Sequence, residues 1–116
     1  MKTVVFIDDD ESLGKLYEAE FSDKYRVIVV RDGGEALDVI KREAPDLVVL
    51  DIMLPGVDGV TLLERIKRLR RDLPVIVSTA YGAYKDSTTI WSADECVIKS
   101  SDLSELREKI EKYLGE

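Results

Sequence analysis

The sequence predicts an α/β fold, namely a doubly wound, five-stranded parallel sheet with helices on both faces. Five short β-branched apolar runs alternate with segments in which apolar residues recur at helical spacing. The runs are apolar at every position rather than at every second one, which is typical of parallel strands covered on both faces. Right-handed crossovers between such strands then restrict the topology to a doubly wound arrangement.

Each strand and helix can be assigned along the chain. The predicted strands are 4–7, 27–30, 47–50, 75–77 and 96–98. Helical spacing predicts a helix after the first, second, third and fifth strands, with these apolar residues: Leu13, Leu16, Tyr17 and Phe21; Ala36, Leu37 and Ile40; Leu62, Leu63, Ile66 and Leu69; Leu103, Leu106, Ile110 and Leu114. Pro45 ends the second helix, and Asp102 with Glu105 predicts a capping box for the last. The segment 84–92 is a poorer helix candidate, because it contains weak helix formers such as Thr88.

Length and composition favour one soluble domain, spanning residues 1–116. The apolar run before Asp8 is too short for a signal peptide or a membrane span. The formal charge of -7 repels phosphate backbones and argues against direct contact with nucleic acid. Cys96 is the single cysteine, so no intramolecular disulfide forms, as suits a reducing compartment. We therefore expect a cytoplasmic chain that does not bind a membrane.

The residues able to do chemistry follow the predicted strands. Asp8 and Asp9 follow the first, Asp51 the third, Thr79 the fourth and Lys99 the fifth. In an open α/β sheet, ligands bind beyond the carboxyl ends of the strands, where strand order reverses. With the order 2-1-3-4-5 the first and third strands are neighbours there, and their three aspartates are expected to converge. The sequence contains no histidine, which excludes histidine bases and histidine metal sites.

These residue types together suit one chemistry. Crowded carboxylates repel one another unless a cation neutralises them. An all-oxygen site with few ligands suits Mg²⁺, which keeps waters and bridges to phosphate. A lysine and a hydroxyl at the same edge can hold phosphoryl oxygens, and a carboxylate left free to attack would form an acyl phosphate. The sequence therefore predicts a magnesium-dependent site for phosphoryl transfer.

The same residues, in this order, resemble the receiver domains of two-component response regulators. The resemblance covers essentially the whole chain and is carried by Asp8-Asp9, by Asp51 in the segment LVVLDIMLPGVDG, by Thr79-Ala80 and by Lys99. It implies a flavodoxin-like fold with Asp51 as the phosphoacceptor. It further implies Mg²⁺ binding by Asp8, Asp9, Asp51 and the backbone carbonyl of Met53, with Asp9 as a direct ligand, and contacts from Thr79 and Lys99 to the phosphoryl group.

The resemblance implies a stand-alone phosphorylation switch. A sensor histidine kinase or a histidine phosphotransfer protein would supply the phosphoryl group to Asp51. The chain would catalyse its own phosphorylation and dephosphorylation, and would not be a multiple-turnover enzyme in the usual sense. The new charge would pull on Thr79 and Lys99 and shift an existing conformational equilibrium. Because the sequence carries no output domain, the signal is expected to reach a downstream protein through contacts.

Three features depart from the family pattern. Cys96 stands three positions before Lys99, where the family usually has an aromatic switch residue, so Tyr81 or Tyr84 is a candidate substitute. Ser100 follows Lys99 where the family usually has a cis proline. We expect a trans bond here, because a non-proline cis bond costs roughly 2.5–4 kcal/mol. The segment before the lysine is shorter than usual, which predicts a stunted fourth helix.

Two other functions compete with the receiver interpretation. Asp8-Asp9-Asp10 after an apolar strand also resembles the Asp-x-Asp opening of haloacid dehalogenase phosphatases, with Asp8 as nucleophile and Asp10 as acid and base. The chain is short for such an enzyme and shows no cap domain. A degenerate receiver that acts as a binding module without phosphorylation is the other alternative. The intact acidic cluster argues against it, and the altered second half argues for it.

Overall fold

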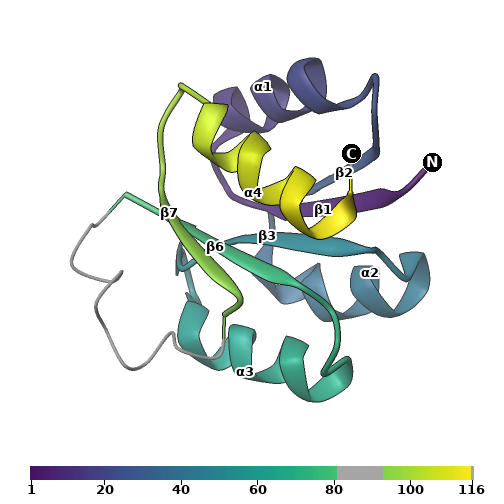
Figure 1. Cartoon of the computed structure of the whole chain (residues 1–116). Helices are drawn as coiled ribbons and strands as arrows, with labels where there is room; N and C mark the ends of the chain where they lie inside the picture. The colour runs from purple at the N-terminus through teal and green to yellow at the C-terminus, as the bar shows by residue number, and fades with distance from the viewer. Residues whose placement is uncertain (81–92, 116) are drawn as a thin grey trace.

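The computed structural model describes residues 1–80 and 93–115, and its centre is a five-stranded parallel sheet (Figure 1). The strand order β2-β1-β3-β6-β7 is the predicted 2-1-3-4-5, because β6 and β7 are the fourth and fifth strands of this sheet along the chain. A short antiparallel hairpin, β4 with β5, follows β3. The strands are β1 (Thr3–Ile7), β2 (Arg26–Val30), β3 (Leu47–Asp51), β4 (Met53–Leu54), β5 (Val57–Asp58), β6 (Val75–Thr79) and β7 (Glu95–Ile98).

Helices cover both faces of the sheet, as the continuous apolar runs predicted (Figure 1). One face carries α1 (Glu11–Phe21) and α4 (Ser104–Leu114), and the other carries α2 (Ala36–Glu43) and α3 (Gly59–Leu69). A single 3₁₀ turn, η1 (Gly33–Glu35), leads into α2. None of the helices within the described ranges combines the length and the apolar character needed to cross a bilayer.

The core lies on the two faces of the central strands. All residues of β1, β3 and β6 are buried, which explains why their sequences do not alternate between apolar and polar residues. On the face of α1 and α4, Phe6 stacks on Tyr17 with ring centroids 4.4 Å apart, and on Phe21 at 5.5 Å. Aromatic pairs at such distances add to the burial of their area. These ring contacts fix α1 against β1 at Phe6, two residues before Asp8.

Of the two predictions about helix ends, the structure confirms the end of the second helix and contradicts the capping box of the last helix. The second helix ends before Pro45 as predicted, with Ala44 in the left-handed region at φ 45°. The capping box predicted for the last helix is wrong. Its first helical residue is Ser104, Leu103 occupies the N-cap position, and the Asp102 carboxylate accepts from the Ser104 N–H at 3.0 Å. Asp102 lies one residue too early to cap the third N–H of the helix. The segment 84–92 lies outside the described residues.

Glu95, at the start of β7, connects α4 to the edge of the sheet through ion pairs and a hydrogen bond. Its carboxylate lies 2.7 Å from the ammonium of Lys112, 2.9 Å from the Tyr113 hydroxyl and 3.3 Å from the ammonium of Lys109. The hydrogen bond from Lys112, joined by those from Tyr113 and Lys109, lowers the pKa of Glu95 from 4.5 to about 2. A lowered pKa means that the folded chain favours the ionised carboxylate.

The Glu95→Gln variant is expected to be less stable than wild type at pH 7. The loss should be about 0.5–1 kcal/mol, because the group lies near solvent and is screened. A carboxylate with a lowered pKa contributes stability above its unfolded value, near 4.5, and loses it as the pH falls towards about 2. Urea unfolding at pH 7 and at pH 2 measures this: the difference between the two chains should vanish at the lower pH. A difference that is the same at both pH values would contradict the assignment.

Candidate functional site

The register of the strands brings the predicted site residues to one edge of the sheet. β1 pairs with β3 up to Ile7 and Leu50, so Asp8 and Asp51 follow side by side. On the other side of β3, Asp51 pairs with Ser78 in β6, and the last pair of β6 and β7 precedes Lys99. The convergence predicted from the strand order is therefore observed.

Asp8, Asp9 and Asp51 form an acidic cluster in which one carboxylate oxygen from each residue lies within 4.8 Å of the others. Asp8 and Asp51 are 2% and 3% exposed, whereas Asp9 is exposed to solvent. Buried carboxylates are costly without partners, and like charges this close raise the cost further. Such a cluster is stable only if cationic or hydrogen-bonding groups reach it.

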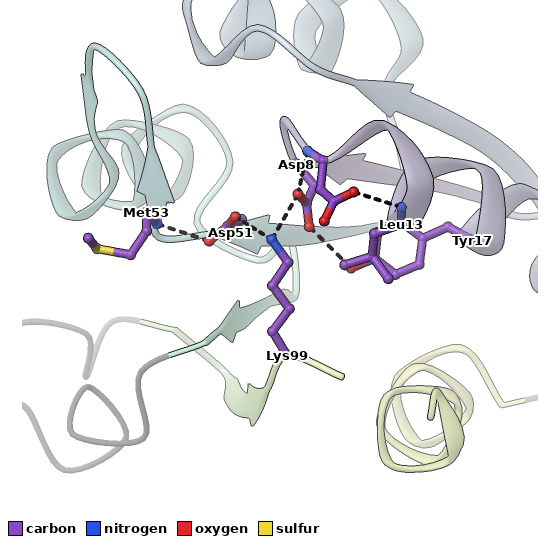
Figure 2. A network of polar contacts seen from close by, with 7 residues as sticks. Asp8, Leu13, Tyr17, Asp51, Met53 and Lys99 are labelled. Carbon is purple, nitrogen blue, oxygen red and sulfur yellow. Dashed lines mark hydrogen bonds and ion pairs between the residues drawn. The ribbon is translucent and has the colours of Figure 1, made fainter. Parts of the chain in front are cut away.

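Within residues 1–80 and 93–115, Lys99 is the cation that reaches the cluster. Its Nζ lies 3.0 Å from Asp8 Oδ1 and 2.9 Å from Asp51 Oδ2, and Figure 2 shows the side chain extending between the two carboxylates. Burial acts to lower the pKa of Lys99, but the hydrogen bonds to Asp51 and Asp8 outweigh it and raise the pKa. The ammonium group therefore stays charged where it meets the two aspartates. The Lys99-Ser100 peptide bond is trans, as predicted.

Backbone N–H groups hold the two buried carboxylates. Asp8 Oδ1 accepts from the Asp10 N–H at 3.0 Å, and Asp51 Oδ1 accepts from the Met53 N–H at 3.0 Å (Figure 2). Burial raises the pKa of Asp8 against the opposing effects of the Asp10 N–H and Lys99. Met53 thus lies directly beside Asp51, as the resemblance required, and the role of its carbonyl in metal binding stays a prediction.

Thr79 lies at the same edge of the sheet as the acidic cluster. Thr79 is fully buried at the end of β6, and its backbone carbonyl accepts from the Lys99 N–H at 2.7 Å. A contact from its side chain to a phosphoryl group stays a prediction.

Asp10 caps α1 by accepting from the Leu13 N–H at 3.0 Å. A carboxylate used as a helix cap is poorly suited to the acid and base role that the phosphatase alternative needs.

Some of the residues considered for the aromatic switch position lie outside the described ranges. Cys96 is half-buried and packs against the core cluster on the side of α2 and α3. Tyr81 and Tyr84, the candidates to replace the usual aromatic residue, both lie outside the described residues. Their role stays a hypothesis.

Sequence reasoning missed the polar role of Tyr17. Its helical spacing placed it correctly in the core, where it is 1% exposed. Its hydroxyl, however, donates to Asp8 Oδ2 at 3.3 Å. Burial raises the pKa of Tyr17, and the charge of Asp8 acts in the same direction. The only signal in the sequence was a hydroxyl-bearing ring among otherwise apolar core positions.

The acidic cluster has the donor set of a magnesium site. All its candidate ligands are oxygens, which hard cations such as Mg²⁺ prefer. Among the described residues, three carboxylates face one ammonium group, so a divalent cation would balance the remaining charge. Asp9 is open to solvent, which leaves room for the waters that Mg²⁺ retains. The residues therefore fit the metal that the sequence predicted.

Comparison with known proteins settles the family. A model of the response regulator receiver domain matches residues 4–111. The chain belongs to this family. A receiver domain is a phosphoacceptor in two-component signalling, and this is the signalling role of the chain. Membership favours the receiver over the phosphatase alternative.

Several known proteins are similar in sequence to nearly the whole chain. Sporulation initiation phosphotransferase F from Bacillus subtilis is 32% identical over 96% of this chain and 92% of its own length. The probable transcriptional regulator ycf27 of Guillardia theta is 37% identical over 96% of this chain, which spans 44% of that protein. The receiver fold therefore occurs in relatives of quite different length.

Solved structures support the same assignment. The response regulator TrrA from Thermotoga maritima, in complex with Mg²⁺-BeF, has a TM-score of 0.91 and 34% identity over 97% of this chain and 99% of that one. TrrA in complex with the histidine kinase ThkA has a TM-score of 0.90 and 35% identity over 98% of this chain and 99% of that one. The receiver fold of this chain is thus shared with a protein crystallised with a kinase.

Proposed function

We propose that Asp51 receives a phosphoryl group and that Asp8, Asp9 and Asp51 hold the Mg²⁺ ion that the reaction needs. The observation that carries this proposal is the position of Lys99, whose Nζ lies within 3.0 Å of both Asp8 and Asp51. Phosphoryl transfer makes few covalent demands on the protein and depends on positioned positive charge. Lys99 places that charge beside the carboxylate that would react.

The reaction forms a bond between a carboxylate oxygen of Asp51 and phosphorus. The bond from phosphorus to the donor nitrogen breaks, and that nitrogen keeps the electron pair. When bound, Mg²⁺ would neutralise charge on the phosphoryl oxygens and on the acidic cluster. Lys99 holds one phosphoryl oxygen, and the Thr79 hydroxyl donates to another. Attack of water on the phosphorus later releases inorganic phosphate and restores the carboxylate.

The donor in this proposal is a sensor histidine kinase or a histidine phosphotransfer protein. The complex of TrrA with the kinase ThkA and the likeness to a sporulation phosphotransferase support it. Residues 1–116 act as one cytoplasmic receiver unit, and the phosphorylated state is transmitted to a downstream protein through contacts. Phosphorylation shifts the balance between two arrangements of the domain because the new dianion interacts with Thr79 and Lys99.

Incubation with acetyl phosphate tests the proposal. The intact mass should rise by one phosphoryl group when Mg²⁺ is present and should not rise when EDTA removes the metal. Hydroxylamine should replace this gain with the smaller gain of a hydroxamate, because it attacks the acyl carbon of an acyl phosphate and releases phosphate, whereas phosphoserine and phosphothreonine stay intact. Continuous release of phosphate from small phosphate esters would instead favour the phosphatase. A chain that gains no mass with any small donor or phosphotransfer protein would favour the binding module.

A further inference from the structure

Tyr17 is the one hydroxyl-bearing side chain of α1 that reaches the acidic cluster in the described part of the chain. Its hydroxyl donates to Asp8 Oδ2 at 3.3 Å. Tyr17 lies in α1, and Asp8 directly follows β1. Tyr17 therefore connects the core of the domain to a predicted metal ligand.

Packing fixes the ring of Tyr17 in this position. The ring lies 4.4 Å from the ring of Phe6, with an angle of 19° between the two planes. Asp8 comes two residues after Phe6 and continues the pairing of β1, because its N–H donates to the Val30 carbonyl at 3.0 Å, so the two side chains point to the same side of the sheet. A ring stacked on Phe6 consequently carries its hydroxyl towards the Asp8 carboxylate, and Figure 2 shows Tyr17 beside Asp8. The contact follows from the packing and does not depend on a flexible side chain.

Asp8 determines which way the hydroxyl hydrogen of Tyr17 points. An ionised carboxylate only accepts hydrogen bonds, so the phenol donates to Asp8 Oδ2. Tyr17 is 1% exposed and Asp8 is 2% exposed, so water has little access to this contact.

The two oxygens of Asp8 consequently have different surroundings. Oδ2 is held from the core side by Tyr17, whereas Oδ1 contacts Lys99 Nζ and the Asp10 N–H. We propose that Tyr17 is a positioning residue that holds the Asp8 carboxylate with Oδ1 turned towards the magnesium position. This inference rests on the metal site proposed above. Hydrogen bonds to metal-ligating groups of this kind orient the ligand and strengthen its binding.

Titration calorimetry with Mg²⁺ tests the inference on the full chain. Tyr17→Phe keeps the ring on Phe6 and removes only the hydroxyl, so the fold should be preserved. Its Mg²⁺ dissociation constant should rise by about tenfold, the lower end of the effect of losing a hydrogen bond to a metal ligand.

Tyr113→Phe is the matched control. It also removes a phenol hydroxyl with protein partners, the Asp94 carbonyl at 3.2 Å and the Glu95 carboxylate at 2.9 Å, but these lie at the start of β7. Its Mg²⁺ affinity should stay within about twofold of wild type, as for a substitution away from the site. An equal loss in this control would overturn the inference, because the effect would then be one of general stability.

The Mg²⁺ dependence of acetyl phosphate labelling gives a second readout. In Tyr17→Phe the half-saturating Mg²⁺ concentration should rise with the dissociation constant, and the rate at saturating Mg²⁺ should change much less. Wild type that binds Mg²⁺ together with an unchanged affinity in Tyr17→Phe would overturn the positioning role and leave the proposed function standing. Wild type that binds no Mg²⁺ would overturn the metal site and this inference with it.

Discussion

An Asp51→Asn chain is expected to gain no phosphoryl group from acetyl phosphate, even at saturating Mg²⁺. The amide is close in size to the carboxylate but carries no anionic oxygen to attack phosphorus. Asp51 ends β3, and its Oδ2 lies 2.9 Å from Lys99 Nζ. Asp8 also contacts Lys99, and each of the two carboxylates accepts from a backbone N–H, but Asp8 additionally accepts from the Tyr17 hydroxyl. We therefore expect Asp51, and not Asp8, to be the carboxylate that attacks phosphorus.

Intact mass, followed over the time in which wild type is fully labelled, measures this loss. The matched control is Asp32→Asn, the same change of acid to amide at an exposed helix start. Asp32 accepts from the Gly34 N–H at 2.8 Å, and asparagine caps about as well as aspartate. The control should be labelled like wild type. Labelling of Asp51→Asn at the wild-type rate would show that another residue is the phosphoacceptor.

The sequence was informative wherever the chemistry follows from strand ends. Continuously apolar runs identify parallel strands buried on both faces, and parallel strands bring their carboxyl ends to one edge. That reasoning was enough to place Asp8, Asp51 and Lys99 together, because each directly follows or ends a strand. The fifth strand was predicted from Cys96 and begins one residue earlier, at Glu95, where a charged residue masks the apolar pattern.

Interactions that depend on the packing between elements could not be predicted in the same way. Helical spacing shows that Tyr17 faces the core, but the partner of its hydroxyl depends on where α1 lies against β1. The capping box failed for a similar reason. Asp102 and Glu105 have the right spacing, but the helix begins two residues after Asp102 and not one. The spacing of two residues in a sequence does not show at which residue the helix begins.

Gly59 stands in a sequence context typical of a turn, but in the structure it allows two segments of the backbone to pack closely. Pro55-Gly56 and Asp58-Gly59 both have turn chemistry in the sequence. Gly56 fulfils it, with a φ of 68° between β4 and β5. Gly59 is the first residue of α3, after Asp58, whose carboxylate accepts from the Val60 N–H at 3.2 Å. A side chain at position 59 would meet the backbone of Ile52, the residue after Asp51.

Gly59→Ala is therefore expected to destabilise the domain by about 3 kcal/mol, at the upper end of the cost of overpacking. A Cβ at this position would lie 2.0 Å from the Ile52 carbonyl oxygen and 2.6 Å from its carbonyl carbon. The backbone fixes the position of a Cβ, so no rotamer relieves this clash. Either α3 or the chain after Asp51 must therefore move. Movement there disturbs the Met53 N–H that holds Asp51 Oδ1, so labelling by acetyl phosphate should slow as well.

Gly14→Ala separates this clash from the general effect of adding a methyl group to a buried glycine. Gly14 lies inside α1, where a Cβ would meet only the Val29 side chain at 3.1 Å, and alanine favours a helix interior by about 1 kcal/mol. Its free energy of unfolding should stay within about 1 kcal/mol of wild type, because Val29 can adjust. Urea unfolding of the three chains measures both effects. Equal stability of Gly59→Ala and Gly14→Ala would contradict the packing role of Gly59 beside Asp51.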